Sequence, residues 1–270
     1  QPQPTQSICV GGTIPALTVA YTGGVGTATY QWYSNTSNAT SGGTAISGAT
    51  SSSFTPPVFN TIGTFYYYAI VSLSGSGCGT ATSTAAEIKV LADPTITTQP
   101  IATQTQCQNA PSTPLTVAAT GGTGTFSYQW YSNTANTTTN GTALSGATST
   151  SYTPLTATVG TLYYYCIITQ TGLGCSVTSS VSSVIVVPAP AITTQPLVNQ
   201  SVCLNGSTTA LTVAYINGAG TASYQWYDDN GLIANAINST YTPIVTATTN
   251  YYCIITFSSG GCTSITSDIA

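Results

Sequence analysis

The sequence predicts an all-β protein composed of three tandem β-sandwich domains, and three observations support this prediction. The motif Tyr-Gln-Trp-Tyr occurs at residues 30–33, 128–131 and 224–227, and these copies contain every Trp of the chain. Other motifs recur around each Trp with a period of roughly 97 residues, the size of one small sandwich domain. Apolar and polar residues alternate within each repeat, and no stretch has the spacing of an amphipathic helix.

The order of the motifs predicts immunoglobulin-like domains. Trp32 takes the place of the Trp on strand C of that fold. Tyr164 precedes Cys166 by two residues, which is the spacing of the tyrosine corner on strand F. Val19 lies where strand B normally carries a Cys, and the other two repeats also have Val at this position. The usual disulfide between strands B and F therefore cannot form.

The domain boundaries are predicted at two junctions that contain proline. Residues 1–93, 94–189 and 190–270 form the three repeats, which are separated by Asp93-Pro94 and by Pro188-Ala-Pro190. Because proline limits backbone freedom and both linkers are short, we expect the domains to form an extended rod.

The third repeat differs from the other two at its end. The first two repeats close with the strand-like segments 87–91 and 184–187, whereas the sequence stops at Ala270 before a counterpart, so the last strand is missing. We therefore expect the chain to be part of a longer array. The alternative is that a neighbouring molecule supplies this strand, although the Pro-containing residues 1–6 are a poor donor segment.

The eight Cys residues indicate disulfides and an oxidising, extracellular or cell-surface location. By position, the early Cys of each repeat should pair with the closing Cys of the same repeat. The predicted pairs are Cys9–Cys78, Cys107–Cys175 and Cys203–Cys262. Cys166 and Cys253 remain, and we expect them to be free buried thiols because Ala69 takes their place in the first repeat. The rival pairing joins Cys166 to Cys175 and leaves Cys107 free, which does not explain the first repeat.

The composition excludes most catalytic chemistry. The chain has no His, one basic residue and five acidic residues, so that charged residues make up 2% of it, against roughly 25% in ordinary soluble domains. A Ser-His-Asp or Cys-His arrangement needs a His, and nucleic-acid binding needs basic residues to neutralise phosphates. We therefore expect no enzyme, no cofactor, no metal site and no nucleic-acid partner. The apolar runs are also too short for membrane insertion.

Two adjacent carboxylates have a simple structural interpretation. Asp228 and Asp229 precede Asn230-Gly231, and Asn-Gly is a strong signal for a tight hairpin turn. The same oxygens would also suit a Ca²⁺ ion. The turn is the favoured interpretation, because no further acidic residue lies nearby in the sequence.

Alternation predicts a candidate contact stripe on the sheet that carries strands C and F. If the Trp side chains point into the core, the neighbouring Tyr side chains point outward. The predicted stripe consists of Tyr33, Tyr66, Tyr68, Tyr131, Tyr163, Tyr165, Tyr227 and Tyr252. It could bind sister chains or sugars; the alternative is that the loop after strand C covers these rings. The Asn- and Thr-rich loops also contain N-glycosylation patterns, which chance produces in such loops, so attached glycans stay an open alternative.

As a set, these motifs resemble the immunoglobulin-like repeats of very large Bacteroidetes cell-surface proteins, which are described as adhesins or gliding-associated proteins. The matching elements are Ile-Thr-Thr-Gln-Pro, the early Cys, Leu-Thr-Val-Ala, Tyr-Gln-Trp-Tyr, Tyr-Thr-Pro, Tyr-Tyr-Tyr-Cys and the closing Gly-Cys. The resemblance implies a surface stalk or filament whose partners are further repeats of a longer chain or copies of itself. The alternative function is a carbohydrate- or surface-binding adhesive module that uses exposed Tyr residues and loops.

Overall fold

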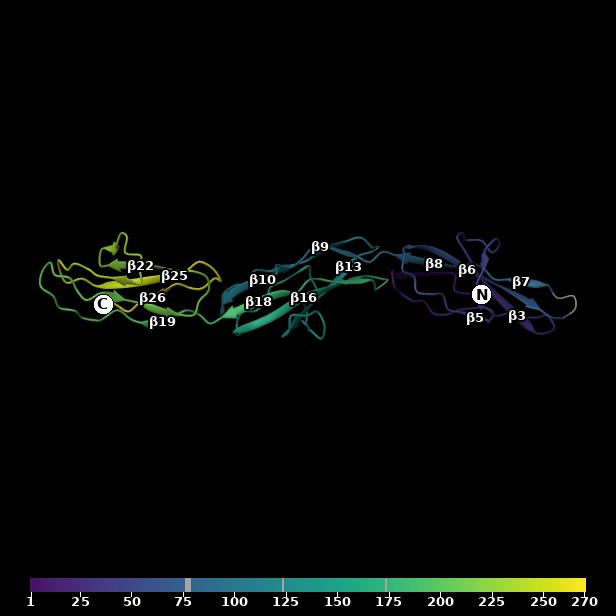
Figure 1. The fold of residues 1–270 in the computed structure, drawn as a ribbon, viewed down its shortest axis with the longest axis horizontal. Coiled ribbons are helices and arrows are strands. Elements are labelled where there is room, and N and C mark those ends of the chain that lie inside the picture. The colour runs from purple at the N-terminus through teal and green to yellow at the C-terminus, as the bar shows by residue number, and fades with distance from the viewer. Residues whose placement is uncertain (76–78, 123, 173) are drawn as a thin grey trace. The chain divides into compact units, whose positions relative to one another are not determined.

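The structure is a computed structural model that describes residues 1–75, 79–122, 124–172 and 174–270. Every regular element in these ranges is a β-strand (Figure 1), and no helix in them is long and apolar enough to cross a membrane. The chain divides into two compact units. One comprises residues 1–97, 119–127 and 168–177, and the other comprises residues 98–118, 128–167 and 178–270. The division therefore passes through the second repeat.

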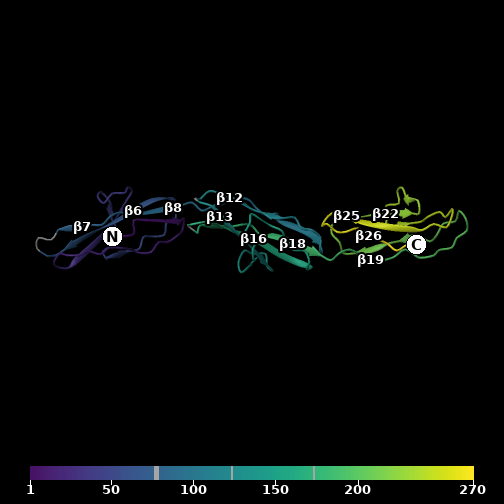
Figure 2. The same ribbon diagram turned by 180° about the vertical axis from the view of Figure 1, so that it is seen from behind.

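The first repeat is a two-sheet sandwich. Its described strands are β1 (Thr5–Cys9), β2 (Leu17–Thr18), β3 (Ala28–Asn35), β4 (Thr44–Ala45), β5 (Ser53–Phe54), β6 (Gly63–Leu73), β7 (Thr80–Thr82) and β8 (Ala86–Leu91). The larger sheet has the order β1-β8-β6-β3-β4, with β7 also paired to β6. β6 and β8 lie side by side in both views (Figures 1 and 2). β1 is parallel to β8, and β2 pairs with β5 in the smaller sheet.

The second repeat has the same topology with one additional strand pair. Its described strands are β9 (Thr95–Thr98), β10 (Thr103–Cys107), β11 (Leu115–Thr116), β12 (Ala118–Thr120), β13 (Phe126–Asn133), β14 (Thr142–Ala143), β15 (Ser151–Tyr152), β16 (Gly160–Gln170), β17 (Ser176–Thr178) and β18 (Ser182–Val187). The larger sheet has the order β10-β18-β16-β13-β14, and β17 pairs with β16. β11 pairs with β15, and β9 pairs with β12. β9 contains the Ile-Thr-Thr sequence, which recurs in the third repeat at residues 192–194.

The third repeat lacks two of these strands in its described residues. Its strands are β19 (Ala191–Thr194), β20 (Leu211–Thr212), β21 (Ala214–Ile216), β22 (Ala222–Asp228), β23 (Gly231–Leu232), β24 (Thr240–Tyr241), β25 (Tyr251–Phe257) and β26 (Ile265–Thr266). The larger sheet is β23-β22-β25-β26, and β19-β21 and β20-β24 form the other pairs. No strand in the described residues of this repeat corresponds to β10 or β18.

Each repeat is built around its own Trp. The side chains of Trp32, Trp130 and Trp226 are completely buried, and the strand B Val of each repeat is buried as well. In the first repeat, Trp32 lies opposite Ala69 of β6 and packs in one cluster with Val19. With strands C, F and G in one sheet and strands B and E in the other, the arrangement is that of an immunoglobulin sandwich. The prediction of tandem immunoglobulin-like domains is therefore confirmed.

The polar residues of the Trp motif hold the loop that follows strand C. The Nε2 of Gln129 donates hydrogen bonds to the backbone oxygens of Trp130 and Leu144, both at 2.8 Å. The indole Nε1 of Trp130 donates to the backbone oxygen of Ser149 at 2.9 Å. These bonds satisfy polar groups that would otherwise be costly to bury. The same contacts recur around Gln31 and Trp32 and around Gln225 and Trp226.

A recurrent Ser, which the sequence analysis does not single out, bridges strands F and G. The hydroxyl of Ser179 is buried, accepts a hydrogen bond from the N–H of Cys166 at 2.9 Å and donates to the backbone oxygen of Ser180 at 2.9 Å. The Gln of the Gln-Pro motif completes this contact, because Oε1 of Gln99 accepts from the N–H of Ser180 at 2.8 Å. The other repeats have equivalent bonds. The hydroxyl of Ser83 accepts from the N–H of Ala69, and Oε1 of Gln1 accepts from the N–H of Thr84. The hydroxyl of Ser267 accepts from the N–H of Cys253, and Oε1 of Gln195 accepts from the N–H of Asp268.

Candidate functional site

A disulfide joins the first repeat to the second. Cys9 at the end of β1 is bonded to Cys175, the closing Cys of the second repeat, and their Cα atoms are 5.6 Å apart. Both residues belong to the same compact unit. A carboxylate oxygen of Asp93 lies within 4.8 Å of the two sulfurs. Because the sulfurs are bonded to each other, they are not thiolate ligands, and this group does not form a metal site.

A second disulfide joins the second repeat to the third in the same way. Cys107 at the end of β10 is bonded to Cys262, the closing Cys of the third repeat, with Cα atoms 5.1 Å apart. The N–H of Cys107 donates a hydrogen bond to the backbone oxygen of Gly260 at 2.8 Å. The N–H of Ala219 donates to Sγ of Cys262 at 3.1 Å. Both residues of this disulfide also lie within one compact unit.

Packing around the second disulfide is close enough to require glycine. Cys107, Ala110 and Ala219 form a small buried cluster. Gly260 has a φ of +74°, and a Cβ added to it would lie 2.6 Å from the Cβ of Ala219. Any larger residue at this position would therefore be strained and would push the hairpin of the third repeat away from Ala219.

The predicted pairing of Cys residues within each repeat is wrong, and sheet geometry explains why. Cys107 lies opposite Val187, and Val186 lies opposite Gly160, so Cys107 is at the Gly160 end of β16. Cys175 follows Gln170, at the other end of this 11-residue strand. At roughly 3.3 Å per residue the two ends are more than about 30 Å apart, whereas bonded Cys residues have Cα atoms about 4.4–6.8 Å apart.

The two observed disulfides also exclude the other two predicted pairs. The predicted pairs Cys9–Cys78 and Cys203–Cys262 cannot form, because Cys9 and Cys262 are bonded elsewhere. Cys203 is a free thiol and is exposed. Cys78 lies outside the described residues. In the first two repeats, the early Cys is therefore bonded to the closing Cys of the following repeat.

The prediction that Cys166 and Cys253 are free buried thiols is confirmed. Each lies on strand F, and Cys253 is directly opposite Trp226. Burial raises the pKa of Cys166 from its ordinary value of 9.0 to about 11, although a backbone hydrogen bond with Gln129 lowers it slightly. Both thiols are therefore protonated and unreactive near neutral pH.

The raised pKa of Cys166 predicts a pH dependence of stability. The unfolded thiol ionises near its ordinary pKa of 9.0 and the folded thiol only near 11, so folding is disfavoured progressively as the pH rises through this range. The Cys166→Ala variant has the same residue at this position as the first repeat, which has Ala69. Because it has no thiol there, it does not lose stability in this way. Urea denaturation should therefore give a constant difference in unfolding free energy between the two proteins below pH 9. From pH 9 to about 11, the unfolding free energy of the wild-type chain should fall relative to that of the variant. A constant difference over this range would contradict the raised pKa of Cys166.

The rings of the predicted Tyr stripe differ in exposure, and two of the eight are buried. Tyr68 and Tyr165 are each only 2% exposed, and the other six rings are half-buried. Tyr33 and Tyr68 stack with ring centroids 5.1 Å apart, as do Tyr131 and Tyr165. The loop after strand C lies over Tyr68, since the N–H of Gly43 donates to its hydroxyl at 3.3 Å. In the second repeat, Gly141 of the equivalent loop lies against the ring of Tyr165. The alternative interpretation, in which the loop covers the rings, therefore holds for Tyr68 and Tyr165. A contact surface formed by the other six rings stays a prediction.

The acidic segment of the third repeat forms the predicted hairpin turn. β22 ends at Asp228 and β23 begins at Gly231, and these two residues are paired. The carboxylate of Asp228 accepts a hydrogen bond from the N–H of Asn230 at 2.8 Å. The carboxylate of Asp229 accepts two from Asn250, at 2.9 and 3.0 Å, and these bonds lower its pKa. Asp228 thus holds the turn itself, and Asp229 joins the turn to the residue that precedes β25.

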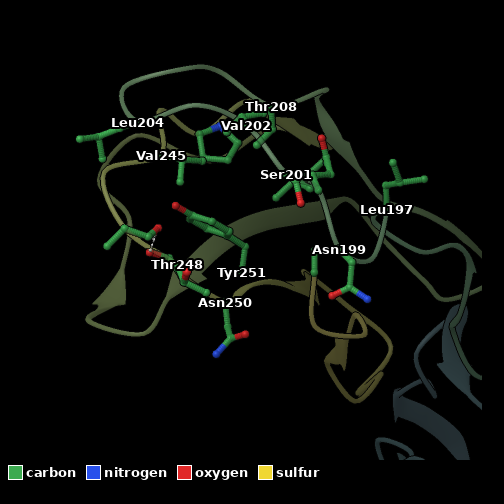
Figure 3. A pocket seen from close by; sticks show the side chains of 16 residues that line it. Leu197, Asn199, Ser201, Val202, Leu204, Thr208, Val245, Thr248, Asn250 and Tyr251 are labelled. Atoms are coloured by element: carbon green, nitrogen blue, oxygen red, sulfur yellow. Dashed lines mark hydrogen bonds between the residues drawn. The ribbon is translucent and has the colours of Figure 1, made fainter.

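The third repeat contains a hollow where the other repeats have strand β8 or β18. The backbones of Tyr251 and Ala270 exchange hydrogen bonds of 3.0 and 2.9 Å, as a paired residue at the start of that strand would. Beyond them lies a hollow of about 380 Å³. Figure 3 shows the ring of Tyr251 near its centre, with Leu197 and Leu204 toward its edges. The hollow therefore leaves apolar side chains and one edge of β25 uncovered by a strand.

The chain matches one protein family over most of its length. Residues 2–92 and 97–188 match the family described as "Domain of unknown function (DUF8696)". No curated protein matches the chain. Its structure is similar to an I-band fragment from titin, with 13% identity, a TM-score of 0.49 and coverage of 99% of this chain and 95% of that chain. It is also similar to extracellular domains 3–5 of Drosophila OTK, with 15% identity, a TM-score of 0.43 and coverage of 98% and 93%.

Proposed function

We propose that this chain, which belongs to the family described as "Domain of unknown function (DUF8696)", is a structural segment of an extracellular array. In this array, immunoglobulin-like repeats form a stalk or filament that carries tension at a bacterial cell surface. The observation that carries the proposal is the pair of disulfides between successive repeats. Each junction has two covalent connections, the peptide linker and the disulfide, so that force can cross it even when one repeat unfolds.

The distribution of polar residues supports a structural rather than a catalytic function. The repeated Gln, Trp and Ser residues are engaged in hydrogen bonds that hold loops and strands of their own repeat. The described residues contain one salt bridge, between Lys89 and Glu87 at 3.4 Å. With charged residues at 2% of the sequence, little electrostatic repulsion keeps neighbouring chains apart, which favours lateral packing in a filament.

A carbohydrate-binding function has less support. It would use the Tyr rings as a stacking platform, but the loop after strand C covers the two that are buried, Tyr68 and Tyr165. Binding of the chain to a glycan array that is abolished by Tyr33→Ser and Tyr131→Ser would favour this second candidate over the structural one.

The two disulfides define how far the chain can be stretched. The shortest covalent path from Gln1 to Ala270 runs to Cys9, crosses to Cys175, returns along the chain to Cys107 and crosses to Cys262. At roughly 3.5 Å per residue, this path has a contour length of roughly 30 nm, against roughly 95 nm for the reduced chain. The load is thus borne without full extension of the repeats.

Single-molecule pulling between the two termini tests the proposal. The decisive protein is the double variant Cys107→Ser with Cys262→Ser, because Cys9–Cys175 alone still bypasses most of the first two repeats. We expect an extended length of roughly 40 nm for this variant. If the disulfides lay within repeats, the variant would retain only a Cys9–Cys78 bond and extend to roughly 70 nm. That length, or full extension of the oxidised wild-type chain, would contradict the proposal.

A further inference from the structure

We propose that the buried thiols Cys166 and Cys253 are latent nucleophiles. When its own repeat unfolds, each attacks the inter-repeat disulfide formed by the closing Cys of that repeat and converts it into a disulfide within the repeat. The proposal rests on the inter-repeat disulfides of the proposed function and extends it by a chemical response to unfolding. Cys253 and both residues of the Cys107–Cys262 disulfide lie in the same compact unit, so the third repeat carries the geometry.

The buried thiol has the same spacing to the closing Cys in both repeats. Cys253 precedes Cys262 by nine residues, and Cys166 precedes Cys175 by nine residues. Both closing Cys residues are bonded to the early Cys of the preceding repeat, whereas both buried thiols are free. Each inter-repeat disulfide therefore has a free thiol close to it along the chain.

The core does not require a thiol at this position. Ala69 takes the place of Cys253 in the first repeat, is 0% exposed and lies opposite Trp32. Cys253 is likewise 0% exposed and lies opposite Trp226. Because Ala fits the same environment, packing alone leaves the sulfur unexplained. The reactivity of the sulfur is what distinguishes the second and third repeats from the first.

The folded sheet keeps Cys253 away from Cys262. Cys253 lies opposite Trp226, inside β22. Sγ of Cys262 accepts a hydrogen bond from the N–H of Ala219, which lies three residues before β22 begins. From its first residue, Ala222, to Trp226, β22 spans roughly 13 Å, whereas bonded Cys residues have Cα atoms about 4.4–6.8 Å apart. The two Cys residues therefore cannot bond while β22 and β25 are paired.

Burial also keeps the thiol inactive in the folded repeat. Cys253 packs in a core cluster with Leu211, Val213 and Trp226. Burial raises its pKa to about 11, although a backbone hydrogen bond with Gln225 lowers it slightly. Because the thiolate is the attacking species, Cys253 is unreactive near neutral pH while the repeat is folded. Unfolding exposes the sulfur and returns its pKa toward the ordinary value of 9.0.

The reaction after unfolding is an intramolecular thiol–disulfide exchange. Cys253 loses its proton to solvent, and its thiolate attacks Sγ of Cys262. The Cys253–Cys262 bond forms, the Cys107–Cys262 bond breaks, and Cys107 leaves as a thiolate that takes a proton from solvent. One thiol and one disulfide are present before and after, so the exchange needs no oxidant or reductant. A short flexible segment gives the two groups an effective concentration in the millimolar range.

The exchange changes the junction between the second and third repeats. The third repeat loses its disulfide to Cys107 and with it one of its two covalent connections to the second repeat. Because the native sheet holds Cys253 and Cys262 too far apart for a disulfide, the new bond also prevents β22 and β25 from pairing as before. A repeat that stays unfolded long enough is thereby locked open, and the exchange makes a prolonged unfolding event permanent.

The test holds the full chain in urea at mildly alkaline pH without a reductant. Samples are acidified to stop the exchange, and their disulfides are mapped by pepsin digestion. In urea that unfolds the repeats, we expect the Cys107–Cys262 bond to be replaced by a Cys253–Cys262 bond, with Cys107 as a free thiol. Without urea, the Cys107–Cys262 bond should persist for the same time.

Two variants make the result specific. Cys253→Ala should lose the Cys107–Cys262 bond at least roughly fivefold more slowly in urea, because every other Cys lies more than three times as far from this disulfide along the chain. Cys203→Ser, which removes the exposed free thiol, is the matched control and should exchange as fast as the wild-type chain. After removal of urea, Cys253→Ala should regain hydrogen-exchange protection in β25, whereas the wild-type chain should not.

The same mapping separates the failure of this proposal from the failure of the proposed function. Loss of the Cys107–Cys262 bond at equal rates in the wild-type chain and in Cys253→Ala would overturn the exchange proposal. Survival of this bond in the unfolded wild-type chain would overturn it as well. In both cases the native sample still contains the inter-repeat disulfides, and the proposed function stands. If the native sample lacks them, both proposals fail.

Discussion

Trp130→Ala is expected to lower the unfolding free energy of the second repeat by about 3–5 kcal/mol, the usual cost of removing a large buried aromatic side chain. Trp130 is completely buried, and a closely packed core relaxes only partly around the cavity that a deleted side chain leaves. Its removal also leaves the backbone oxygen of Ser149 without the indole donor at 2.9 Å. Because a domain of this size has only about 5–15 kcal/mol of total stability, the second repeat should be close to unfolding.

Hydrogen exchange resolved along the chain is the suitable measurement, because it reports each repeat separately. Protection should fall in β13, β16 and β18 and persist in β22 and β25, whose core is formed by Trp226. Trp130→Phe is the matched control, since it keeps much of the volume but not the indole donor, and it should cost less. A loss below about 1 kcal/mol for Trp130→Ala would show that this Trp is not the centre of its core.

Removal of the second disulfide by Cys107→Ser with Cys262→Ser should have the other large effect. The loop it closes has a sequence separation of 155 residues, and the chain-entropy model gives up to about 5 kcal/mol for a loop of this length. The Cys9–Cys175 loop overlaps it and still constrains the unfolded chain. We therefore expect a loss of about 3 kcal/mol, measured by guanidinium denaturation under oxidising conditions.

Two comparisons make this result specific. Cys253→Ala, which removes a buried free thiol of the third repeat, should cost less than about 1.5 kcal/mol because it changes only a small side chain. In a reducing buffer, the wild-type chain and the double variant should become nearly equal in stability. A double variant as stable as the wild-type chain under oxidising conditions would show that the disulfide adds nothing to the folded array.

The features that lie within a single repeat, such as its core and its buried thiol, could be predicted from the sequence. Alternation and the Trp motif indicate a separate core for each domain, and Trp32, Trp130 and Trp226 are completely buried. The absence of a strand B Cys and the presence of Ala69 in the first repeat predict the buried free thiols, and Cys166 and Cys253 are free and buried. These properties follow from local periodicity and from the volume available at one position.

The disulfide pairing could not be predicted from spacing, because a periodic sequence gives the position of a Cys within a repeat but not the repeat of its partner. Cys175 has the same place relative to Cys107 as to Cys9, apart from one period. The strand register resolves this ambiguity, since it places the early and closing Cys residues at opposite ends of β16. The length of strand F can be read from the sequence. It would have indicated that the early and closing Cys residues of one repeat lie too far apart to bond.

Whether the Tyr stripe is covered could not be decided from the sequence, for a different reason. Alternation along a strand assigns a face to each side chain but does not show what packs on that face. A Cβ added to Gly141 would lie 2.5 Å from the hydroxyl of Tyr165, so glycine is required where the loop crosses the ring. Gly43 has the same role at Tyr68. A Gly at the same distance after the Trp in both long loops was the available signal.

Peptide mapping without reduction tests the central claim, that disulfides connect successive repeats, most directly. The native chain should be digested at acidic pH, where thiol–disulfide exchange is suppressed, with pepsin, because a chain with a single basic residue offers trypsin almost no cleavage sites. The account predicts one linked peptide pair that contains Cys9 and Cys175 and a second pair that contains Cys107 and Cys262. Linked peptides that join Cys107 to Cys175, or Cys203 to Cys262, would contradict it.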